Sequence, residues 1–267
     1  MKTTHIALVL DRSGSMASTA EEAVNNYNDQ VRAFKKTAEE TGVDVKVSMV
    51  TFSTDVFEHL WEVSAADLQE CKQGDFVADG WTAMLDGIGY AIEKFRETTD
   101  YNSPDNNYMF VIITDGQENK SQHYNWSAIQ EMMDSLQKTD RWTFTFMGCD
   151  KAYITEAAHR LNVPVANCAI YNNYSAAAAK VGYRRSAGHI YKSAVALARG
   201  GSSCNTVYSA DADSYADFAV DSSIDPAPTG PNLWANPQMA GQIQPEPVTS
   251  SGTAVFSTGN KVTAWKA

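Results

Sequence analysis

The sequence lacks an excess of basic residues. Its 267 residues include 21 Lys and Arg against 32 Asp and Glu, which gives a formal net charge of −11. A protein that holds nucleic acid or an anionic membrane through a general basic field needs the opposite balance. We therefore expect no nucleic-acid partner and no membrane partner, whereas the acidic balance is compatible with cation binding.

Long hydrophobic runs and paired cysteines are also missing. Nowhere do about eighteen apolar residues run together, as a membrane-spanning helix requires, and the first apolar run is too short for the core of a signal peptide. The four cysteines lie far apart and form no Cys-x-x-Cys pair, which disfavours a disulfide framework and a zinc knuckle. These absences predict a soluble, cytoplasmic protein with free thiols.

The motifs of several common enzyme classes are absent as well. The chain contains no Gly-x-Ser-x-Gly elbow, no Walker loop, no Gly-x-Gly-x-x-Gly fingerprint and no His-Glu-x-x-His. This favours a non-enzymatic role.

What the chain does contain is an alternation of strand and helix patterns. The expected strands are 5–10, 44–54, 56–63, 108–113, 142–148 and 165–170, and the expected helices are 18–42, 64–72, 85–95, 127–138, 152–161 and 175–198. Strands that alternate with helices of this length form a mostly parallel sheet with helices on both faces, whereas the tight link at 53–55 requires an antiparallel pair. We predict a three-layer α/β/α, doubly wound domain over residues 1–200, with one antiparallel edge strand. Its first helix should begin with the capping box Ser18-Thr-Ala-Glu21.

Residues 201–267 differ from this domain in composition. Six of the eight prolines lie at or beyond Pro226, together with many Gly and Ser residues, which is typical of a disordered extension. The stretch 253–265, in contrast, has the pattern strand, Gly-containing turn, strand. Two outcomes stay open: a β-hairpin at 253–265 that docks on the domain or on a partner with Trp265 buried, or a free tail.

Polar residues follow the expected strands at three places. Asp11, Ser13 and Ser15 alternate directly after the first strand, Thr82 precedes a helix, and Asp115 follows the strand at 108–113. An Asp-x-Ser-x-Ser loop alone often only caps a helix, but loops after adjacent parallel strands open on one edge of a sheet, where ligands bind. Carboxylate and hydroxyl oxygens suit a hard cation such as Mg²⁺. The sequence therefore predicts a cation site at this edge.

Three segments in this order resemble the von Willebrand factor type A domain and its metal-ion-dependent adhesion site: DRSGSM at 11–16, Gly80-Trp-Thr82-Ala and Ile113-Thr-Asp115-Gly116. The resemblance covers roughly residues 1–200 and extends to short stand-alone members from bacteria and phages. It implies a Rossmann-like fold and five metal-holding residues, namely Asp11, Ser13, Ser15, Thr82 and Asp115. It further implies Mg²⁺, with Mn²⁺ as the alternative ion, and a partner protein whose carboxylate completes the octahedron.

The leading functional hypothesis is thus a protein–protein interaction module in which the cation bridges to an acidic residue of a partner. A structural or assembly protein that acts through its C-terminal tail is the alternative. A metal-dependent phosphohydrolase is less favoured, because such sites generally place a second carboxylate two residues after the first, and here that position is Ser13. The oligomeric state and an ATPase partner, common for bacterial proteins of this kind, stay open.

Five further residues have roles that the sequence leaves open. Trp81 stands where relatives often carry a small residue, and its ring either tunes which ligand fits or packs onto the loop. Glu118 either reaches the cation or, as we favour, is a solvated loop acid, and His123 either lines the rim or has no specific role. Arg184 and Arg185 form either a basic patch or a solvated helix face.

Overall fold

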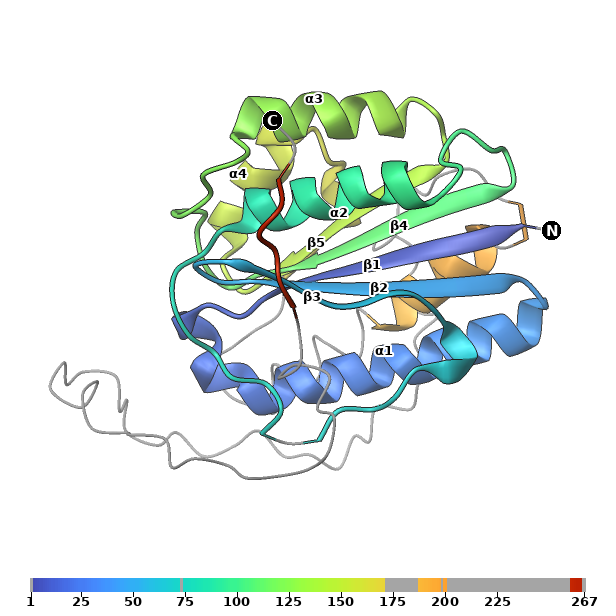
Figure 1. Cartoon of the computed structure of the whole chain (residues 1–267), viewed down its shortest axis with the longest axis horizontal. Helices are drawn as coiled ribbons and strands as arrows, with labels where there is room; N and C mark the ends of the chain where they lie inside the picture. Colours follow the sequence, from blue (N-terminus) through green and yellow to red (C-terminus); the bar gives the residue numbers. More distant parts are fainter. Residues whose placement is uncertain (1, 73, 171–186, 198, 201–259, 266–267) are drawn as a thin grey trace, which may run out of the picture.

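The computed structural model describes residues 2–72, 74–170, 187–197, 199–200 and 260–265 (Figure 1). Arg184, Arg185 and most of the expected helix over 175–198 lie outside this part of the chain. So do residues 253–259, the first half of the expected hairpin. The division at residue 200 between domain and extension stays a prediction.

Seven strands form one sheet in the order β6-β5-β4-β1-β2-β3-β7. Their bounds are β1 Thr3–Asp11, β2 Asp44–Phe52, β3 Val56–Ser64, β4 Asn106–Ile113, β5 Trp142–Gly148, β6 Cys168–Ile170 and β7 Asn260–Lys261. The five strands from β6 to β2 pair in parallel, and β3 pairs antiparallel with β2. The predicted mostly parallel, doubly wound sheet is confirmed. The predicted antiparallel edge is also confirmed, and β7 adds a further antiparallel pair on the outer side of β3.

Helices cover both faces of the sheet, which gives the predicted three layers (Figure 1). The helices with printed bounds are α1 Ala20–Thr41, α2 Met84–Thr98, α3 Trp126–Gln137 and α4 Lys151–Arg160, and a further helix spans 187–197. α1 and the helix at 187–197 pack on one face, and α2, α3 and α4 pack on the other. Among the described residues, no helix is long and apolar enough to span a membrane.

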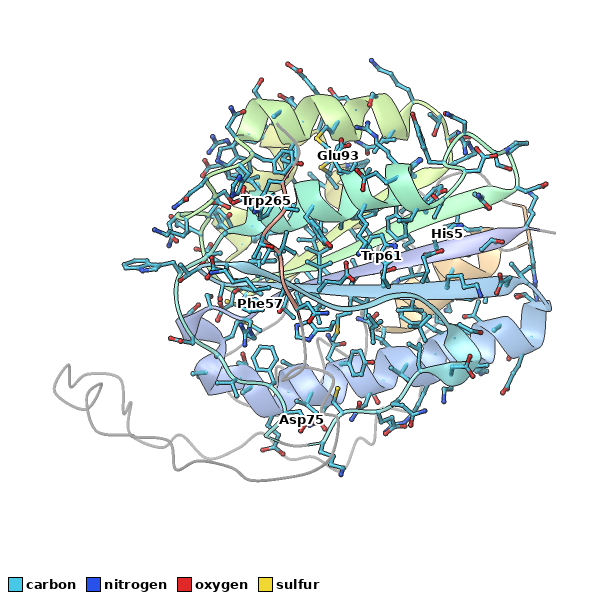
Figure 2. All side chains as sticks on the ribbon, in the orientation of Figure 1. His5, Phe57, Trp61, Asp75, Glu93 and Trp265 are labelled. Carbon is cyan, nitrogen blue, oxygen red and sulfur yellow. The ribbon has the colours of Figure 1, made fainter. Side chains whose placement is uncertain are left out.

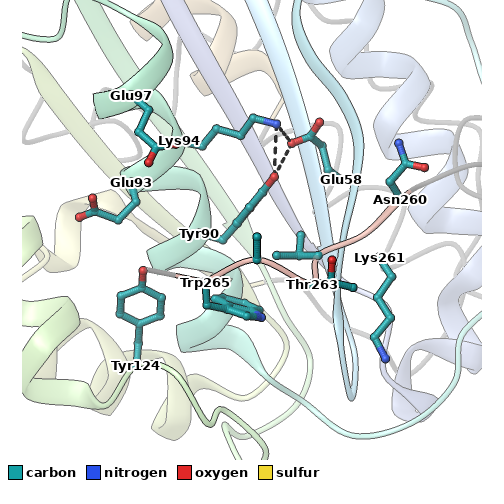
Figure 3. Close-up of a pocket in the computed structure, with 12 residues that line it drawn as sticks. Glu58, Tyr90, Glu93, Lys94, Glu97, Tyr124, Asn260, Lys261, Thr263 and Trp265 are labelled. Carbon is teal, nitrogen blue, oxygen red and sulfur yellow. Dashed lines mark hydrogen bonds and ion pairs between the residues drawn. The ribbon is translucent and has the colours of Figure 1, made fainter. Parts of the chain in front are cut away.

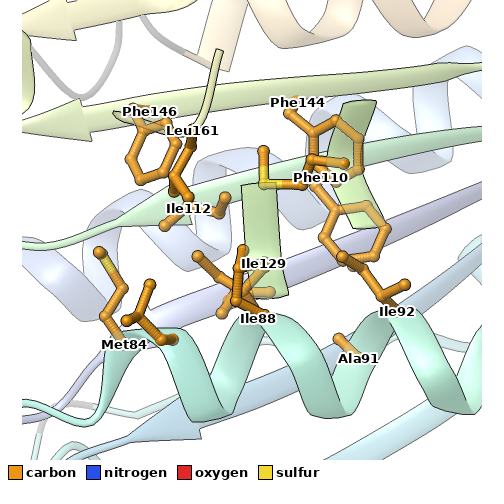
Figure 4. Close-up of a cluster of buried hydrophobic side chains, with 14 of the residues drawn as sticks. Met84, Ile88, Ala91, Ile92, Phe110, Ile112, Ile129, Phe144, Phe146 and Leu161 are labelled. Carbon is orange, nitrogen blue, oxygen red and sulfur yellow. The ribbon is translucent and has the colours of Figure 1, made fainter. Parts of the chain in front are cut away.

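β1 lies in the middle of the sheet with both faces covered, which explains why its sequence is continuously apolar. Successive side chains of a strand point to opposite faces. Ile6 and Leu8 therefore join the core under α1, while Ala7 and Val9 join the core under α2. Figure 4 shows the second of these cores, in which side chains of α2 meet aromatic and aliphatic side chains of β4 and β5. Burial on both faces fixes the register of β1, and with it the position at which the strand ends on Asp11.

The predicted capping box at the start of the first helix is wrong. Residues Gly14–Thr19 instead form a 3-10 helix, and α1 begins at Ala20 without a side-chain cap. The Thr19 hydroxyl donates back to the carbonyl oxygen of Met16 at 3.3 Å. The loop after β1 thus winds directly into α1, which leaves no separate cap position.

Two further elements are shorter than predicted. The expected helix at 64–72 is only a 3-10 turn, Ala65–Asp67. The expected strand at 165–170 begins with a 3-10 turn, Val165–Asn167, and only Cys168–Ile170 pairs with β5. Both segments are too short to carry a full helical or strand period, so tertiary packing decides their form.

Residues 260–265, here called the strap, lie against the domain. Asn260 and Lys261 pair with β3, and the Val262 amide donates to the carbonyl oxygen of Val56 at 2.8 Å. Of the two outcomes that the sequence left open, these six residues follow the docked one, but no strand continues over residues 262–265, and Trp265 is half-buried rather than buried. Figure 2 shows Trp265 on the α2 side of the sheet, whereas Asp75 lies on the α1 side.

Candidate metal centre

The carboxyl ends of β1 and β4, neighbours in the middle of the sheet, carry the two carboxylates of the candidate site. Leu10 pairs with Ile113, so Asp11 and Asp115 leave the sheet at the same edge. The hydroxyl of Thr114 donates to Asp11 Oδ2 at 2.6 Å, and the hydroxyl of Ser15 donates to Asp115 Oδ1 at 2.6 Å. Two side-chain hydrogen bonds therefore join the loop after β1 to the loop after β4.

The alternate oxygens of the first loop converge as predicted. The Ser13 amide donates to Asp11 Oδ1 at 2.7 Å, and the Ser13 and Ser15 hydroxyl oxygens lie 3.1 Å apart in a hydrogen bond. Asp11 is 1% exposed and Ser13 is 2% exposed, whereas Ser15 is exposed. The cluster is therefore closed beneath Asp11 and open to solvent beside Ser15.

Thr82 comes from a third loop, which pairs with the first one. The Gly14 amide donates to the carbonyl oxygen of Gly80 at 3.0 Å, and the Asp79 amide donates to that of Arg12 at 2.9 Å. Gly80 has a φ of 80°, and a Cβ there would clash with the side chain of Thr54. This turn therefore requires glycine, and it places Thr82, which is 3% exposed, beside the carboxylates.

Oxygens from two of the loops lie close together beside Gly116, a residue of the third loop. A Cβ placed on this glycine would lie 3.2 Å from Thr82 Oγ1, 3.5 Å from Ser15 Oγ and 3.8 Å from Asp11 Oδ2. The loop after β1 and the loop before α2 thus direct ligand-type oxygens at one small volume, which the missing Cβ leaves open. We call this volume the Gly116 cradle.

The donor chemistry of the cradle fits a hard divalent cation. Among the described residues, no cluster of three His, Cys, Asp or Glu side chains occurs, so any ion here would depend on hydroxyl ligands as well as carboxylates. Magnesium binds through one or two carboxylates and otherwise neutral oxygens, several of them water. The five residues predicted from the sequence therefore match this ion in type.

The raised pKa values of the two aspartates are also consistent with a cation at this position. Burial raises the pKa of Asp11 from 3.8 to about 6, and the nearby charge of Asp115 adds to the rise, although hydrogen bonds from Thr114 and Ser13 oppose it. Burial also raises the pKa of Asp115. The ionised form of both carboxylates is thus disfavoured in the protein alone. A bound cation favours that form, because an opposite charge within a few ångströms stabilises it.

Asn119 holds Thr82 in place, and sequence reasoning missed it. The Thr82 amide donates to Asn119 Oδ1 at 3.0 Å, while the amides of Asn119 and Lys120 donate to the Thr82 carbonyl oxygen at 3.0 and 3.2 Å. Three hydrogen bonds therefore fix the backbone of Thr82, which carries one of the candidate ligand hydroxyls. Asn119 lies four residues after Asp115, so one loop both supplies a carboxylate and positions a hydroxyl.

Glu118 is neither a metal ligand nor a solvated acid. Its carboxylate accepts hydrogen bonds from the Leu85 amide at 2.9 Å, from the Lys120 amide at 2.9 Å, and from the Ser121 amide and hydroxyl, both at 2.8 Å. The Leu85 amide is one of the first N–H groups of α2, which find no partner within the helix itself. Glu118 thus caps α2 from another loop.

Asp86, in the first turn of α2, was also missed. It is 4% exposed, and its two carboxylate oxygens accept from the backbone amides of Gln122, His123 and Tyr124 at 2.9 to 3.0 Å. Loop 116–124 and the start of α2 therefore bind each other reciprocally. One signal was available in the sequence: the residues directly before Met84 include no side chain that caps the helix, so a distant acceptor was needed.

The open roles of Trp81 and His123 are resolved in part. Trp81 is 62% exposed, so its ring does not pack down onto the loop, although its amide donates to Thr54 Oγ1 at 3.1 Å. The His123 ring stacks on the Trp265 ring, with the ring centroids 3.9 Å apart and the planes 7° apart. His123 therefore has a specific structural contact, made with the strap.

Comparisons with known proteins agree with this architecture. The family model of the von Willebrand factor type A domain matches residues 5–194. A search of the curated proteins finds no match.

Similar solved structures share little sequence with the chain. The pilus adhesin SpaC from Lactobacillus rhamnosus GG is 16% identical over 72% of this chain and 31% of its own, with a TM-score of 0.51. A von Willebrand factor type A protein from Catenulispora acidiphila is 15% identical over 73% of this chain and 43% of its own, with a TM-score of 0.49. Proximal thread matrix protein 1 from the mussel byssus, in a structure with a zinc-occupied MIDAS motif, is 18% identical over 60% of this chain and 39% of its own, with a TM-score of 0.40. The chain thus spans less than half the length of each of these proteins.

A family model that matches most of the chain, together with the observed sheet order, shows that this protein belongs to the von Willebrand factor type A domain family.

Proposed function

We propose that this chain is a non-enzymatic interaction module that binds a divalent cation and, through it, a carboxylate of a partner protein. The ion is Mg²⁺, with Mn²⁺ as the alternative, and its ligands are Asp11, Ser13, Ser15, Thr82 and Asp115. The observation that carries the proposal is the Gly116 cradle, where two hydroxyl oxygens and one carboxylate oxygen from two loops lie near one volume, with Asp115 hydrogen-bonded to Ser15 beside them.

The ligand set accounts for the preference for an acidic partner. Three of the five ligands are neutral hydroxyls, so two carboxylates at most balance a doubly charged ion and add no excess negative charge. The ion supplies a coordination position that a further carboxylate can take. The exposed Ser15 marks the side from which the partner approaches, because Asp11, Ser13 and Thr82 are covered by the protein.

The same geometry supports a binding role over catalysis. An aspartate that attacks a phosphoryl group works with a second acid close by that protonates the leaving group. Here Ser13 stands where that second carboxylate would lie.

Isothermal titration calorimetry with Mg²⁺ tests the cation site. We expect saturable binding to the wild type at up to millimolar ion, since sites that retain water are weak, and none to Asp11→Asn or Asp115→Asn. Asp105→Asn is the matched control, because this exposed aspartate lies before β4, at the opposite edge of the sheet. Equal binding by all four proteins would refute the assignment.

The partner chemistry is tested with two peptides in excess Mg²⁺, acetyl-Gly-Gly-Asp-Gly-Gly-amide and acetyl-Gly-Gly-Asn-Gly-Gly-amide, whose blocked ends carry no charge. They differ only in whether a carboxylate is present. We expect chemical-shift changes at the Ser15 and Gly116 amides with the Asp peptide and not with the Asn peptide, and neither set of changes in EDTA. Identical responses to both peptides would show that the ion does not recruit a carboxylate.

A further inference from the structure

The strap reaches from the edge of the sheet to the metal-site loop. At its first end, Lys261 pairs with Phe57 of β3, and its ammonium group forms an ion pair with Asp55 at 2.7 Å. At its other end, Trp265 stacks on His123 and meets the rings of Tyr90 and Tyr124 edge to face, at centroid distances of 6.1 and 6.2 Å. The two ends are therefore anchored on different elements.

Between these two anchors the strap stands away from α2 (Figure 3). A cavity of about 310 Å³ lies under it, with Glu58, Tyr90 and Lys94 among its lining residues. Thr263 and Ala264, which span the cavity, are exposed. Because the middle of the strap makes little contact, Trp265 carries the docking of its far end, where it packs against the core on the α2 side.

Two of the residues that Trp265 contacts, His123 and Tyr124, belong to loop 116–124, which also holds Thr82. The His123 and Tyr124 amides both donate to Asp86 of α2. The Tyr124 ring lies so close to the same helix that a Cβ on Gly89 would come within 2.5 Å of it. One side of this loop is thus fixed by α2, and the other side is covered by Trp265.

We infer that Trp265 is a positioning residue for the metal centre. The stack on His123 fixes the far end of the loop whose near end carries Asp115 and whose Asn119 clamps Thr82. Docking of the strap and binding of the cation are therefore coupled, and by linkage each strengthens the other. This inference rests on the proposed cation site and adds to it a residue 150 positions along the chain from Asp115.

The test uses the full chain with three substitutions. Trp265→Ala removes the stack, Trp265→Phe keeps an aromatic ring over His123, and Thr263→Ala changes an exposed strap residue as the control. Calorimetry with Mg²⁺ should show an affinity about fivefold or more weaker for Trp265→Ala, at the lower end of ordinary coupling between sites. Trp265→Phe should restore most of the loss, and Thr263→Ala should match the wild type.

Amide hydrogen exchange in EDTA measures positioning without any metal. The Thr82 amide donates to Asn119, so loosening of loop 116–124 should speed its exchange in Trp265→Ala but not in Thr263→Ala. In the wild type, Mg²⁺ should slow exchange of the Val262 amide, which ties the strap to β3.

If the wild type binds Mg²⁺ and Trp265→Ala binds it as tightly as Thr263→Ala does, the stack has a structural role only and the inference is wrong. If the wild type binds no Mg²⁺, the proposed cation site is wrong, and the exchange experiment alone tests whether Trp265 positions the loop. Equal exchange rates of the Thr82 amide in Trp265→Ala and Thr263→Ala would then refute the inference.

Discussion

The two central loops of the candidate site are built in different ways. In loop 11–16 the candidate ligand residues also contact one another, as in the bond from the Ser13 amide to Asp11 and the bond between the Ser13 and Ser15 hydroxyls, besides their bonds to Thr114 and Asp115. Loop 116–124 makes its contacts with distant parts of the chain: Glu118 with the start of α2, Asn119 with Thr82, and His123 with the strap. In the proposed site, the first loop supplies ligand residues, and the second positions Thr82 and the start of α2.

This difference explains which residues a sequence pattern can reveal. A ligand set on one tight turn leaves a short, fixed spacing, as in Asp11, Ser13 and Ser15. A supporting contact joins two segments at a separation set by the fold; Thr82 and Asn119 are 37 positions apart in sequence. No spacing rule marks such a pair in a single chain.

The largest effect is expected from Gly116→Ala, which places one methyl group in the Gly116 cradle. In Gly116→Ala the added Cβ would lie 3.2 Å from Thr82 Oγ1, within the volume that the cation needs. We expect calorimetry to detect no Mg²⁺ binding, while the free energy of unfolding in EDTA changes by about 1 kcal/mol or less.

Gly14→Ala is the matched control for this substitution. Its Cβ would lie 3.5 Å from the Gly80 carbonyl oxygen, an ordinary contact outside the ring of ligand oxygens. Unimpaired Mg²⁺ binding by Gly116→Ala would show that the ion, if bound, lies elsewhere.

The second prediction concerns stability rather than binding. Asp86→Ala removes the acceptor of three backbone amides in loop 116–124. Buried donors left without a partner cost about 1–3 kcal/mol each, and the loop can relax toward water, so we expect a total loss of about 3 kcal/mol. Urea unfolding in EDTA measures it. Asp86→Asn, which keeps one oxygen acceptor, should lose less stability. Equal stability of the wild type and Asp86→Ala would show that the bonds from Asp86 to loop 116–124 do not stabilise the fold.

Much of the fold was predictable because local patterns agree with tertiary packing. The apolar run of β1 and the tight link at 53–55 predict a buried central strand and an antiparallel pair, and both are observed. The pairing of Leu10 with Ile113 then brings Asp11 and Asp115 together without further information.

The errors share a physical cause. The capping box at Ser18 failed because the bond from Thr19 to Met16 continues the turn begun after β1. The burial of Trp265 was overestimated because the strap ends on the small ring of His123 and leaves a cavity beside it. In each case a contact outside the local pattern determined the structure.

A third prediction separates positioning from ligation within one loop. Asn119→Ala removes the acceptor for the Thr82 amide but leaves all five ligand side chains in the chain. We expect Mg²⁺ affinity to fall about tenfold, the equivalent of one hydrogen bond of about 1.4 kcal/mol. Asn119→Asp, which retains an oxygen acceptor, should restore most of it. Full affinity in Asn119→Ala would mean that Thr82 keeps its place without the clamp.

The smallest effect is expected at Trp81, the direct neighbour of a ligand. Its side chain is 62% exposed, and its hydrogen bond to Thr54 is made by the backbone amide, which every residue except proline possesses. Trp81→Ala should therefore leave the Mg²⁺ affinity within about twofold of the wild type and the free energy of unfolding within about 0.5 kcal/mol, as for most surface substitutions. Calorimetry and urea unfolding measure both, with Thr82→Ala as the neighbouring comparison that removes a ligand hydroxyl. A loss of cation affinity in Trp81→Ala as large as that in Thr82→Ala would contradict this prediction, because it would mean that the exposed Trp81 side chain contributes to the site as much as the Thr82 hydroxyl does.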